Sequence, residues 1–396
     1  MENSISRKIG QFMEAGSWIR RMFEQGAELK ARYGAENVFD FSIGNPMGEP
    51  PDNFINALKT AVSDPTPGLH GYMPNAGYPH VRKILAEHLS GDHGVSLTAD
   101  HLIMTVGAAG ALNVALKALV NAGESVLIFA PYFVEYRFYA DNVNANAIIV
   151  ETDQTFNLDI DAIENVLEPG VKALIINTPN NPTGRVYSES TLTRLAELLD
   201  AKSEAFGHPI YLLSDEPYKR IVYDGIHVPS LLQIYKRALI CTSYSKELSI
   251  PGERLGYIAV NPDCPGAKTM INALTFCNRI LGFVNAPALM QRALGLAIDA
   301  HVDIAQYQNN RDIFLKHLRR MGYEVSTPEG AFYLFVRSPI EDDVAFVAHL
   351  AKEKILAVPG QGFGRSGFFR LSYCVTSETI ENAMPGFERV IRSILS

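Results

Sequence analysis

Short apolar runs alternate with longer stretches of helical period between about residue 100 and residue 261. The runs have about the length of buried strands, and the stretches between them repeat apolar positions every three to four residues. This alternation indicates a mostly parallel α/β sheet sandwiched by helices. We expect strands within residues 101–106, 125–131, 146–151, 173–179, 209–216, 238–246 and 255–261.

The pattern changes after about residue 290. A long helical stretch over 288–321 is followed by apolar runs at 331–337, 355–360 and 368–374, with a helix predicted over 342–354. This mixture predicts a smaller α+β unit, on which a helix around 18–33 is expected to pack. We therefore predict a large domain over 46–289 and a smaller discontinuous domain made of 1–45 and 290–396.

A segment rich in Pro and Gly, residues 63–80, is predicted to be a long loop. An ordinary linker is one interpretation. A rigid surface loop with a function is the other, because Tyr72 and Tyr78 lie among many turn residues.

Composition places the chain among ordinary folded proteins. It has 396 residues, of which 47% are hydrophobic and 20% charged, and this excludes disordered and collagen-like classes. The net charge is -8, and the Lys and Arg residues are scattered along the chain. We therefore expect no nucleic-acid partner.

Membrane and metal signals are also missing from the sequence. No uncharged apolar run reaches the roughly 18 residues that span a bilayer, and the first residues lack a long apolar signal segment. The four cysteines, at positions 241, 264, 277 and 374, have neither C-x-x-C nor metal-ligand spacing. We therefore predict no metal and no membrane association, and free thiols in a reducing, cytoplasmic location.

A lysine follows one of the predicted buried strands, in the segment Ser243-Tyr244-Ser245-Lys246. Open α/β sheets place their ligands at the carboxyl ends of the strands. A lone lysine is ordinarily a solvated surface residue. Here the hydroxyls of Ser243 and Ser245, with Arg254 eight positions after Lys246, have the pattern of an anion cradle around an amine that can form a Schiff base.

Three further features allow a structural or a functional interpretation. Asp215 ends a predicted strand, where it could cap a helix or serve a ligand. The small residues 107–110 lie between a strand and a helix, where they could permit tight packing or bind a phosphate through backbone amides. Arg370 interrupts an apolar run and needs a partner, either a structural carboxylate or an anionic ligand.

The Ser-x-Ser-Lys segment, with Arg254 and a following Gly-Tyr, resembles the fold-type I pyridoxal-phosphate enzymes, specifically the class I aminotransferases that act on aspartate and aromatic substrates. Further matches follow in the family's order over almost the whole chain. They are 41–46 (FSIGNP), 177–184 (NTPNNPTG), 215–218 (DEPY) and 369–373 (FRLSY).

The resemblance implies a pyridoxal 5'-phosphate cofactor held by Lys246 as an internal aldimine. It further implies that Asp215 pairs with the ring nitrogen, which needs a carboxylate to stay protonated and to withdraw electrons. Other implied cofactor contacts are Asn181 and Tyr218 with the phenolic oxygen, Phe133 with the ring face, and Ala108, Ala109, Ser243, Ser245 and Arg254 with the phosphate.

The resemblance also implies a substrate site and a partner subunit. Arg370 would hold the substrate carboxylate, with the backbone near Gly44 closing over it. The loop 71–78 resembles the family segment whose tyrosine, here Tyr72, reaches the cofactor phosphate of the neighbouring subunit. A homodimer with shared active sites follows from that likeness.

The implied reaction is a ping-pong transfer of an amino group from an L-amino acid to a 2-oxo acid. A neutral or aromatic donor is favoured, because Ala109 stands where some aspartate-using relatives have a lysine. Arg279 could restore a second carboxylate site from the partner subunit. The aromatic residues of segment 132–139 could line an apolar pocket or pack in the core.

Three other interpretations remain to be weighed. A carbon-sulfur β-lyase of the same fold shares the early chemical steps, and a catalytically silent effector-binding protein shares the fold. A nicotinamide enzyme is disfavoured, because the glycine pattern at 362–367 precedes a predicted strand and not a helix.

Overall fold

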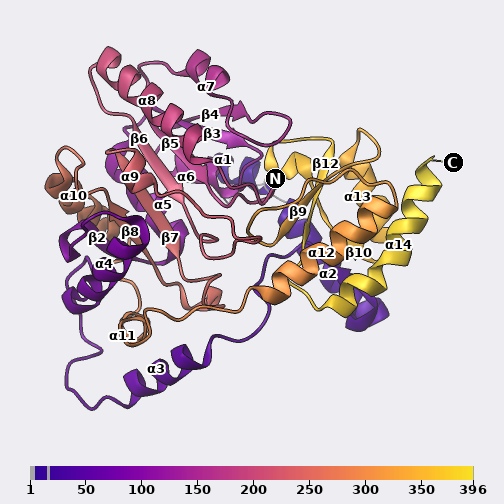
Figure 1. Ribbon diagram of the computed structural model, residues 1–396, viewed down its shortest axis with the longest axis horizontal. Helices are drawn as coiled ribbons and strands as arrows, with labels where there is room; N and C mark the ends of the chain where they lie inside the picture. Colours follow the sequence, from indigo (N-terminus) through magenta and orange to yellow (C-terminus); the bar gives the residue numbers. More distant parts are fainter. Residues whose placement is uncertain (1–4, 16–17, 396) are drawn as a thin grey trace.

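The computed structural model describes residues 5–15 and 18–395. Two sheets of unequal size dominate it, and Figure 1 shows the larger one on the left and the smaller one on the right. The predicted domain segment 1–45 is therefore described except for residues 1–4 and 16–17.

The larger sheet has seven strands in the order β2-β8-β7-β6-β5-β3-β4. Strands β3 to β7 run parallel to one another, whereas β8 is antiparallel to both of its neighbours. This confirms the mostly parallel sheet that the sequence predicts. The bounds are β2 Leu102–Thr105, β3 Ser125–Ala130, β4 Asn146–Glu151, β5 Val171–Asn177, β6 Tyr211–Asp215, β7 Ala238–Ser243 and β8 Gly256–Val260.

Two apolar layers cover the faces of this sheet. On one face, α5 (Gly107–Leu119), α6 (Glu135–Asn142) and α10 (Ala267–Ile280) contribute buried side chains to one cluster. The cluster on the other face draws on α3 (Asp52–Ser63), α4 (Pro79–His93), α7 (Ile160–Val166), α8 (Glu189–Phe206), α9 (Leu231–Ile234) and α11 (Ala288–Leu296). Buried strands thus lie between two helical layers, as their continuous apolar runs require.

The smaller part combines a three-stranded antiparallel sheet with a two-stranded parallel one. The first has the order β11-β12-β9, and the second pairs β1 with β10. Their bounds are β1 Phe39–Asp40, β9 Tyr333–Arg337, β10 Ile355–Leu356, β11 Val358–Pro359 and β12 Phe368–Ser372. The associated helices are α2 Trp18–Tyr33, α12 Ala305–Arg320, α13 Asp343–Lys352 and α14 Ser377–Leu395. Helix α1 (Arg7–Ala15) instead contacts α6 of the larger part, where Phe12 packs against Phe138 and Lys8 pairs with Asp141. Strands β9 and β12, with helices α12 to α14, share one apolar cluster.

Three predicted elements differ from the structure. The helical stretch 288–321 is broken after Leu296, because Val302 N donates to Glu247 O and Asp303 bonds the backbone of Ala305 at the start of α12. The run 355–360 is split between two sheets. Strand β4 is an edge strand with largely exposed side chains, so its apolar run is not buried as expected.

Among the described residues, short 3-10 helices lie at Ala35–Asn37, Ala99–His101, Pro251–Glu253 and Gly360–Phe363. The last overlaps the start of the glycine pattern 362–367, and the rest of the pattern leads into β12. The glycine pattern 362–367 therefore precedes a strand and does not open a long helix, as expected from the sequence.

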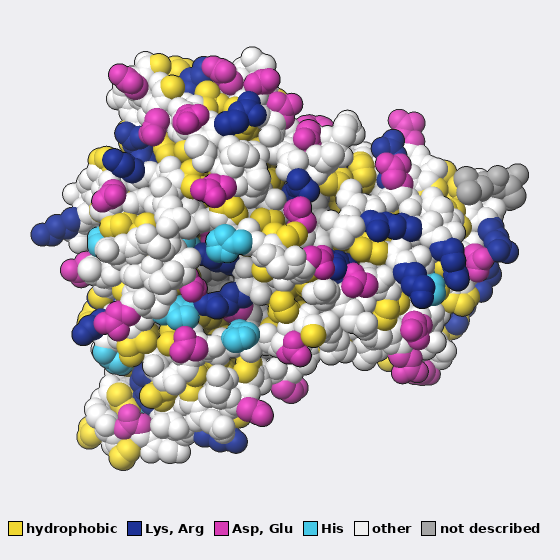
Figure 2. Space-filling model, viewed as in Figure 1, with side chains coloured by type: hydrophobic (Ala, Val, Ile, Leu, Met, Phe, Trp, Pro, Cys, Tyr) yellow, Lys and Arg dark blue, Asp and Glu magenta, His cyan; other side chains and the backbone are white. Residues whose placement is uncertain are grey.

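Positive and negative side chains are intermixed over the face drawn in Figure 2. The surface shown has no field of a single sign, in keeping with scattered Lys and Arg residues. Within the part of the chain that the structure describes, no helix has the length and apolar character needed to cross a membrane.

Candidate active site

The carboxyl ends of β5, β6 and β7 meet at one edge of the large sheet. Asn177 closes β5 and pairs in register with Asp215, which closes β6. Ser243 closes β7, and the turn after it carries Lys246. Because these strands are parallel, their polar end residues converge on the place where open α/β sheets bind ligands.

A cavity of about 430 Å³ opens at this edge. Every residue predicted for the site lines it, except Tyr72. The predicted lining residues are Gly44, Ala108, Ala109, Phe133, Asn181, Asp215, Tyr218, Ser243, Ser245, Lys246, Arg254 and Arg370. Residues from seven separate parts of the sequence therefore meet in one cavity.

The Lys246 amine is held inside this cavity. Its Nζ donates to the Gly44 carbonyl at 2.8 Å and lies 5.5 Å from the centroid of the Phe332 ring. Burial, together with the positive charges of Arg370 and Arg254, lowers the pKa of Lys246 to about 8. About a tenth of this amine is then neutral at pH 7, far more than for a lysine with the ordinary pKa, and nucleophilic attack on a carbonyl requires the neutral form.

The Asp215 carboxyl group is buried and only half satisfied. Tyr136 Oη donates to its Oδ2 at 2.5 Å, whereas Oδ1 has no hydrogen-bond partner among the described residues. Burial raises the pKa of Asp215 to about 7, and the Tyr136 hydrogen bond opposes that rise. A cationic ring N–H placed beside Oδ1 would donate a hydrogen bond to this oxygen and favour the ionised form of Asp215.

A second group of residues that line the cavity has the chemistry to bind an anion. The first turn of α5 supplies Ala108 and Ala109, the end of β7 supplies Ser243, and the segment after β7 supplies Ser245 and Arg254. Gly107 has φ +68°, and a Cβ there would come within 3.1 Å of the Arg254 guanidinium. Backbone amides at a helix start, hydroxyls and a cation form a suitable phosphate site. With Lys246 and the free Asp215 oxygen, these residues fit pyridoxal phosphate.

Arg370 reaches the cavity from strand β12 of the smaller part. Its Nη1 donates to Asn181 Oδ1 at 3.2 Å and its Nη2 to Ser42 O at 2.6 Å. The guanidinium carbon lies 4.5 Å from the Tyr333 ring centroid and 4.8 Å from that of Phe363. Nε is buried without a hydrogen-bond partner in the described chain. None of these contacts is a carboxylate, so the charge of Arg370 is available to an anionic ligand.

Gly44 is required by this packing. A Cβ at residue 44 would collide with the hydroxyl of Tyr333. The absence of a side chain lets the 42–44 backbone approach both Tyr333 and the Lys246 amine.

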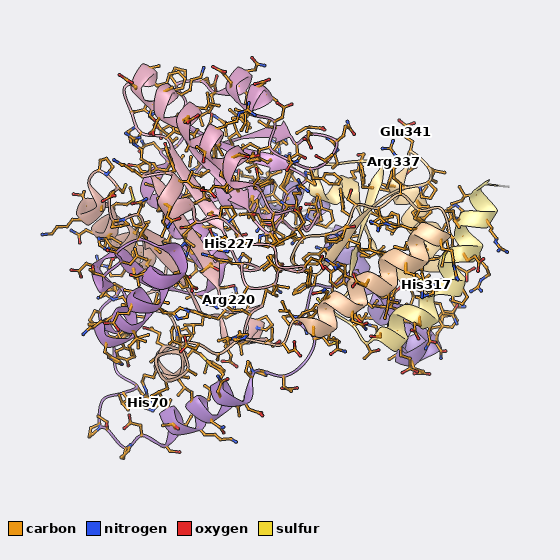
Figure 3. All side chains as sticks on the ribbon, in the orientation of Figure 1. His70, Arg220, His227, His317, Arg337 and Glu341 are labelled. Carbon is orange, nitrogen blue, oxygen red and sulfur yellow. The ribbon has the colours of Figure 1, made fainter. Side chains whose placement is uncertain are left out.

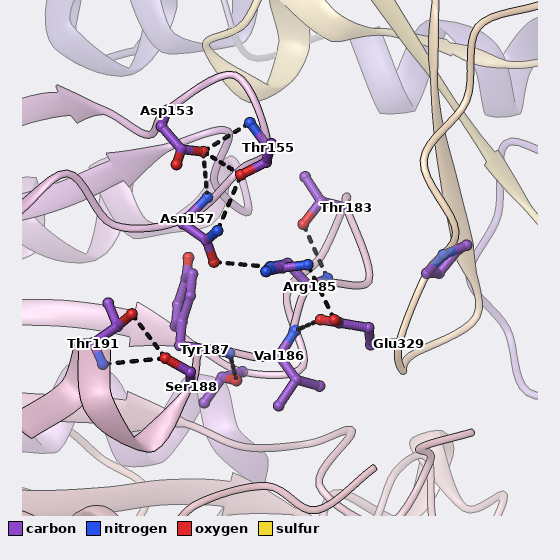
Figure 4. Close-up of polar contacts among 12 residues, drawn as sticks. Asp153, Thr155, Asn157, Thr183, Arg185, Val186, Tyr187, Ser188, Thr191 and Glu329 are labelled. Atoms are coloured by element: carbon purple, nitrogen blue, oxygen red, sulfur yellow. Dashed lines mark hydrogen bonds and ion pairs between the residues drawn. The ribbon is translucent and has the colours of Figure 1, made fainter. Parts of the chain in front are cut away.

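The segment that follows Asn181 is fixed to the smaller part, and Figure 4 shows Arg185 and Val186 bonded to Glu329. Glu329, in the turn before β9, accepts from Arg185 Nη1 at 3.0 Å and from Val186 N at 2.8 Å. Gly184 O also accepts from the backbone of Glu329 and Gly330. We refer to the contact between residues 184–186 and 329–330 as the seam.

Sequence reasoning missed three polar residues that organise the cavity. Asn177 Nδ2 donates to Asp215 O at 2.8 Å, and its Oδ1 accepts from Asn181 N at 2.6 Å. Tyr333 lies 3.1 Å from Tyr218, hydroxyl to hydroxyl. Tyr136 was expected only as one of several aromatic residues that could line a pocket. The position of Asn177 at a strand end was the one signal that could have identified it.

Tyr72 and Arg279 lie away from the cavity of their own chain. Tyr72 is 97% exposed, and neither residue is among the described residues that line the chamber. Figure 3 shows His70, two residues before Tyr72, at the lower left edge of the molecule. The loop that carries Tyr72 therefore projects outward and does not enter its own site.

Comparison with known proteins gives consistent results. The model of the family described as aminotransferase class I and II matches residues 36–386. A probable aspartate aminotransferase of Methanocaldococcus jannaschii is 30% identical, over 88% of this chain and 92% of the relative. Aromatic-amino-acid aminotransferase 2 of Thermococcus litoralis is 31% identical, over 95% of this chain and 96% of the relative. A solved amino transferase from Eubacterium rectale has a TM-score of 0.95 and 40% identity, covering 98% of this chain and 99% of its own.

Proposed function

Because this chain belongs to the family of class I and II aminotransferases and is an aminotransferase of fold-type I, we propose that it works with pyridoxal phosphate bound covalently to Lys246. The observation that carries the proposal is the convergence of three groups on one cavity. They are the Lys246 amine, the free oxygen of Asp215 and the Arg370 guanidinium.

When bound, pyridoxal phosphate supplies a carbonyl carbon for reaction with amines and an electron-withdrawing ring. The chain's own residues hold and orient it. Asp215 Oδ1 would pair with the ring nitrogen, Asn181 and Tyr218 would bind the phenolic oxygen, and Phe133 would contact the ring. Ala108, Ala109, Ser243, Ser245 and Arg254 would bind the phosphate.

Lys246 has a second role as the group that moves the proton. Its neutral Nζ takes the proton from the substrate Cα and can deliver it again on the same side. The low pKa of this amine supports that role, since a base is most effective when its pKa is close to the working pH. The same residues would serve both halves of a ping-pong reaction, first with an amino acid and then with a 2-oxo acid.

Arg370 binds the α-carboxylate of the substrate, with the 42–44 backbone alongside. A planar guanidinium in contact with two rings can offer two parallel N–H groups to a carboxylate. The cations among the described lining residues are Lys246, Arg254 and Arg370, each already assigned to the cofactor or to this carboxylate. A second carboxylate would find no cation of this chain. We therefore propose a neutral or aromatic amino donor.

The relatives named above include both an aspartate and an aromatic aminotransferase, so names alone do not select the substrate. The substrate proposal depends on the cavity. Leu112 and Tyr139 line it together with Phe133, and these side chains would accept an apolar or aromatic group.

We propose a homodimer that shares its active sites. The exposed Tyr72 would reach the phosphate site of the partner's cavity. Within one chain, Ser243, Ser245 and Arg254 line that phosphate site, and Tyr72 does not. The four free cysteines support the proposed cytoplasmic location.

Labelling tests the cofactor proposal. Protein loaded with pyridoxal phosphate is reduced with borohydride and its peptides are mapped, in the wild type, in Lys246→Ala and in Lys202→Ala as a control. Lys202, on α8, pairs with Glu164 of α7 and is not among the described residues that line the cavity. We expect label on the Lys246 peptide in the wild type and in Lys202→Ala. Label on another lysine would overturn the proposal.

Incubation with a panel of amino acids and 2-oxoglutarate tests the reaction. Amino transfer yields glutamate and a new 2-oxo acid. Release of pyruvate and ammonia without an acceptor would identify a β-lyase. Cofactor binding without turnover of any amino acid would instead identify an effector-binding protein.

A further inference from the structure

Tyr136 lies behind the cavity and does not line it. It belongs to α6, is buried, and donates through Oη to Asp215 Oδ2 at 2.5 Å. Its ring packs edge-on against Phe133, with the two centroids 5.7 Å apart. Tyr136 is thus in contact with two residues proposed to touch the cofactor while remaining outside the chamber itself.

The hydrogen bond from Tyr136 makes the surroundings of the two Asp215 carboxylate oxygens different. Oδ2 is engaged by Tyr136, and Oδ1 is buried without a partner among residues 5–15 and 18–395. The main chain of Asp215 is fixed separately, because Asn177 donates to its carbonyl. The Tyr136 hydrogen bond therefore fixes the rotation of the carboxyl group and selects which oxygen faces the ligand.

The same hydrogen bond favours the ionised carboxylate. Burial alone disfavours charge on Asp215, and a donor on one oxygen opposes that effect. The other ionisable groups near Tyr136 and Asp215 would not replace the Tyr136 hydroxyl as a hydrogen-bond donor to Asp215. Glu216 raises the Asp215 pKa, and the remaining groups are weak acids. The titratable neighbours on the packed elements are Tyr139, Glu216, Tyr218 and Cys241.

We propose that Tyr136 is a positioning residue that keeps Asp215 ionised and turned toward the ring nitrogen of the bound cofactor. The inference rests on the proposed function, since it concerns the same site. Tyr136 acts through Asp215 and touches no reacting atom. Its effect should therefore appear in the electronic state of the cofactor and should depend on Asp215.

The test is a pH titration of the visible absorbance of the lysine-bound cofactor. Loss of the donor lets burial favour neutral Asp215, so the ring holds its proton less well and withdraws fewer electrons. The apparent pKa of the band should then rise by at least about half a unit in Tyr136→Phe. Tyr235→Phe is the matched control, because Tyr235 Oη donates to Ile210 O at 2.6 Å in the other apolar layer.

A double-variant comparison separates positioning from a general structural effect. In Asp215→Asn, adding Tyr136→Phe should produce no further shift, because the group that Tyr136 acts on is gone. Tyr136→3-fluorotyrosine keeps the shape and makes the hydroxyl a stronger donor, so it should shift the band in the opposite direction. This second variant serves even where Tyr136→Phe does not fold.

The outcomes separate the inference from the function. A wild type with no visible band after loading would overturn the proposed function and this inference together. A wild type with the band, and Tyr136 variants that titrate as it does, would overturn the inference alone. An equal shift in the Asp215→Asn background, or in Tyr235→Phe, would do the same.

Discussion

The guanidinium carbon of Arg370 lies 4.5 Å from the centroid of the Tyr333 ring. A cation over an aromatic face gains about 0.5–2 kcal/mol, and the ring also fixes the plane of the guanidinium. Tyr333 therefore prepares Arg370 for a planar carboxylate before any ligand arrives.

Replacing this ring should weaken substrate binding. In Tyr333→Leu we expect the KM for the amino acid to rise roughly 2- to 30-fold, the equivalent of the lost cation–ring attraction. Tyr333→Phe keeps the ring and should change KM less. Steady-state kinetics of both variants measure the two KM values. A KM that is larger in Tyr333→Phe than in Tyr333→Leu would contradict the role given to the ring.

The Lys246 amine should capture its cofactor at unusually low pH. Its pKa lies at about 8 and not at the ordinary 10.5, so the neutral, reactive form accumulates above pH of about 8. Rapid mixing of cofactor-free protein with pyridoxal phosphate should show a capture rate that rises with pH and levels off beyond that value. A rate still rising toward 10.5 would show that burial does not depress this pKa.

Removal of the amine should abolish turnover without abolishing binding. Lys246→Ala retains the residues proposed for the phosphate and should still bind the cofactor non-covalently. Its transamination rate should fall by several orders of magnitude, because covalent exchange and proton transfer are both lost. Equilibrium dialysis for binding and glutamate formation for turnover measure the two properties separately.

Asp215→Asn should separate activity from stability. We expect a loss of activity of at least about 100-fold, the scale of a missing electrostatic partner in an active site. In the cofactor-free protein, the Asp215 pKa is raised from 3.8 to about 7, so the folded state binds more protons than the unfolded state in this range. Wild-type stability should therefore decrease as pH rises from about 3.8 to 7, relative to Asp215→Asn. Melting temperatures of both proteins across this range test the sign.

Tyr72 should act across a subunit interface. Tyr72→Phe should weaken cofactor retention by about 1–3 kcal/mol, the contribution of one hydrogen bond to a charged group. The proposed dimer is checked by sedimentation of the wild type. A fully active monomer would contradict both statements.

Aspartate should be a poorer donor than phenylalanine, tyrosine, leucine or alanine. Burying the second carboxylate of aspartate without a cation is costly. Comparison of kcat/KM across these amino acids gives the answer. A tenfold advantage for aspartate, about 1.4 kcal/mol, would mean that a cation outside this chain's cavity, such as the partner's Arg279, serves that carboxylate.

The sequence was sufficient to predict that Asp215 and Lys246 meet at one edge of the large sheet. Parallel strands place their carboxyl ends at one edge, so Asp215 and Lys246 could be brought together from the strand pattern alone. The roles that the family resemblance gives to the lining residues stay predictions, as do the domain boundaries and the dimer.

The partner of Asp215 could not be predicted in the same way. Tyr136 lies 79 positions before it, and the stretch 132–139 offers several aromatic residues of similar character. Phe133 and Tyr139 do line the cavity, whereas Phe138 packs against Phe12 of α1. Periodicity identifies the buried face of a helix, but the choice of hydrogen-bond partner depends on how that helix is placed across the sheet.

The seam near Glu329 has a consequence for unfolding. Arg370 comes from the smaller sheet and Asn181 from a loop of the larger one, and they are joined by a hydrogen bond beside that contact. A carboxylate bound there would be held by both parts of the chain at once, so loosening either part would release it. Its binding free energy would therefore stabilise the two parts jointly. Calorimetry should show a melting transition that moves upward with ligand concentration and becomes more cooperative, with the two sheets losing their structure together.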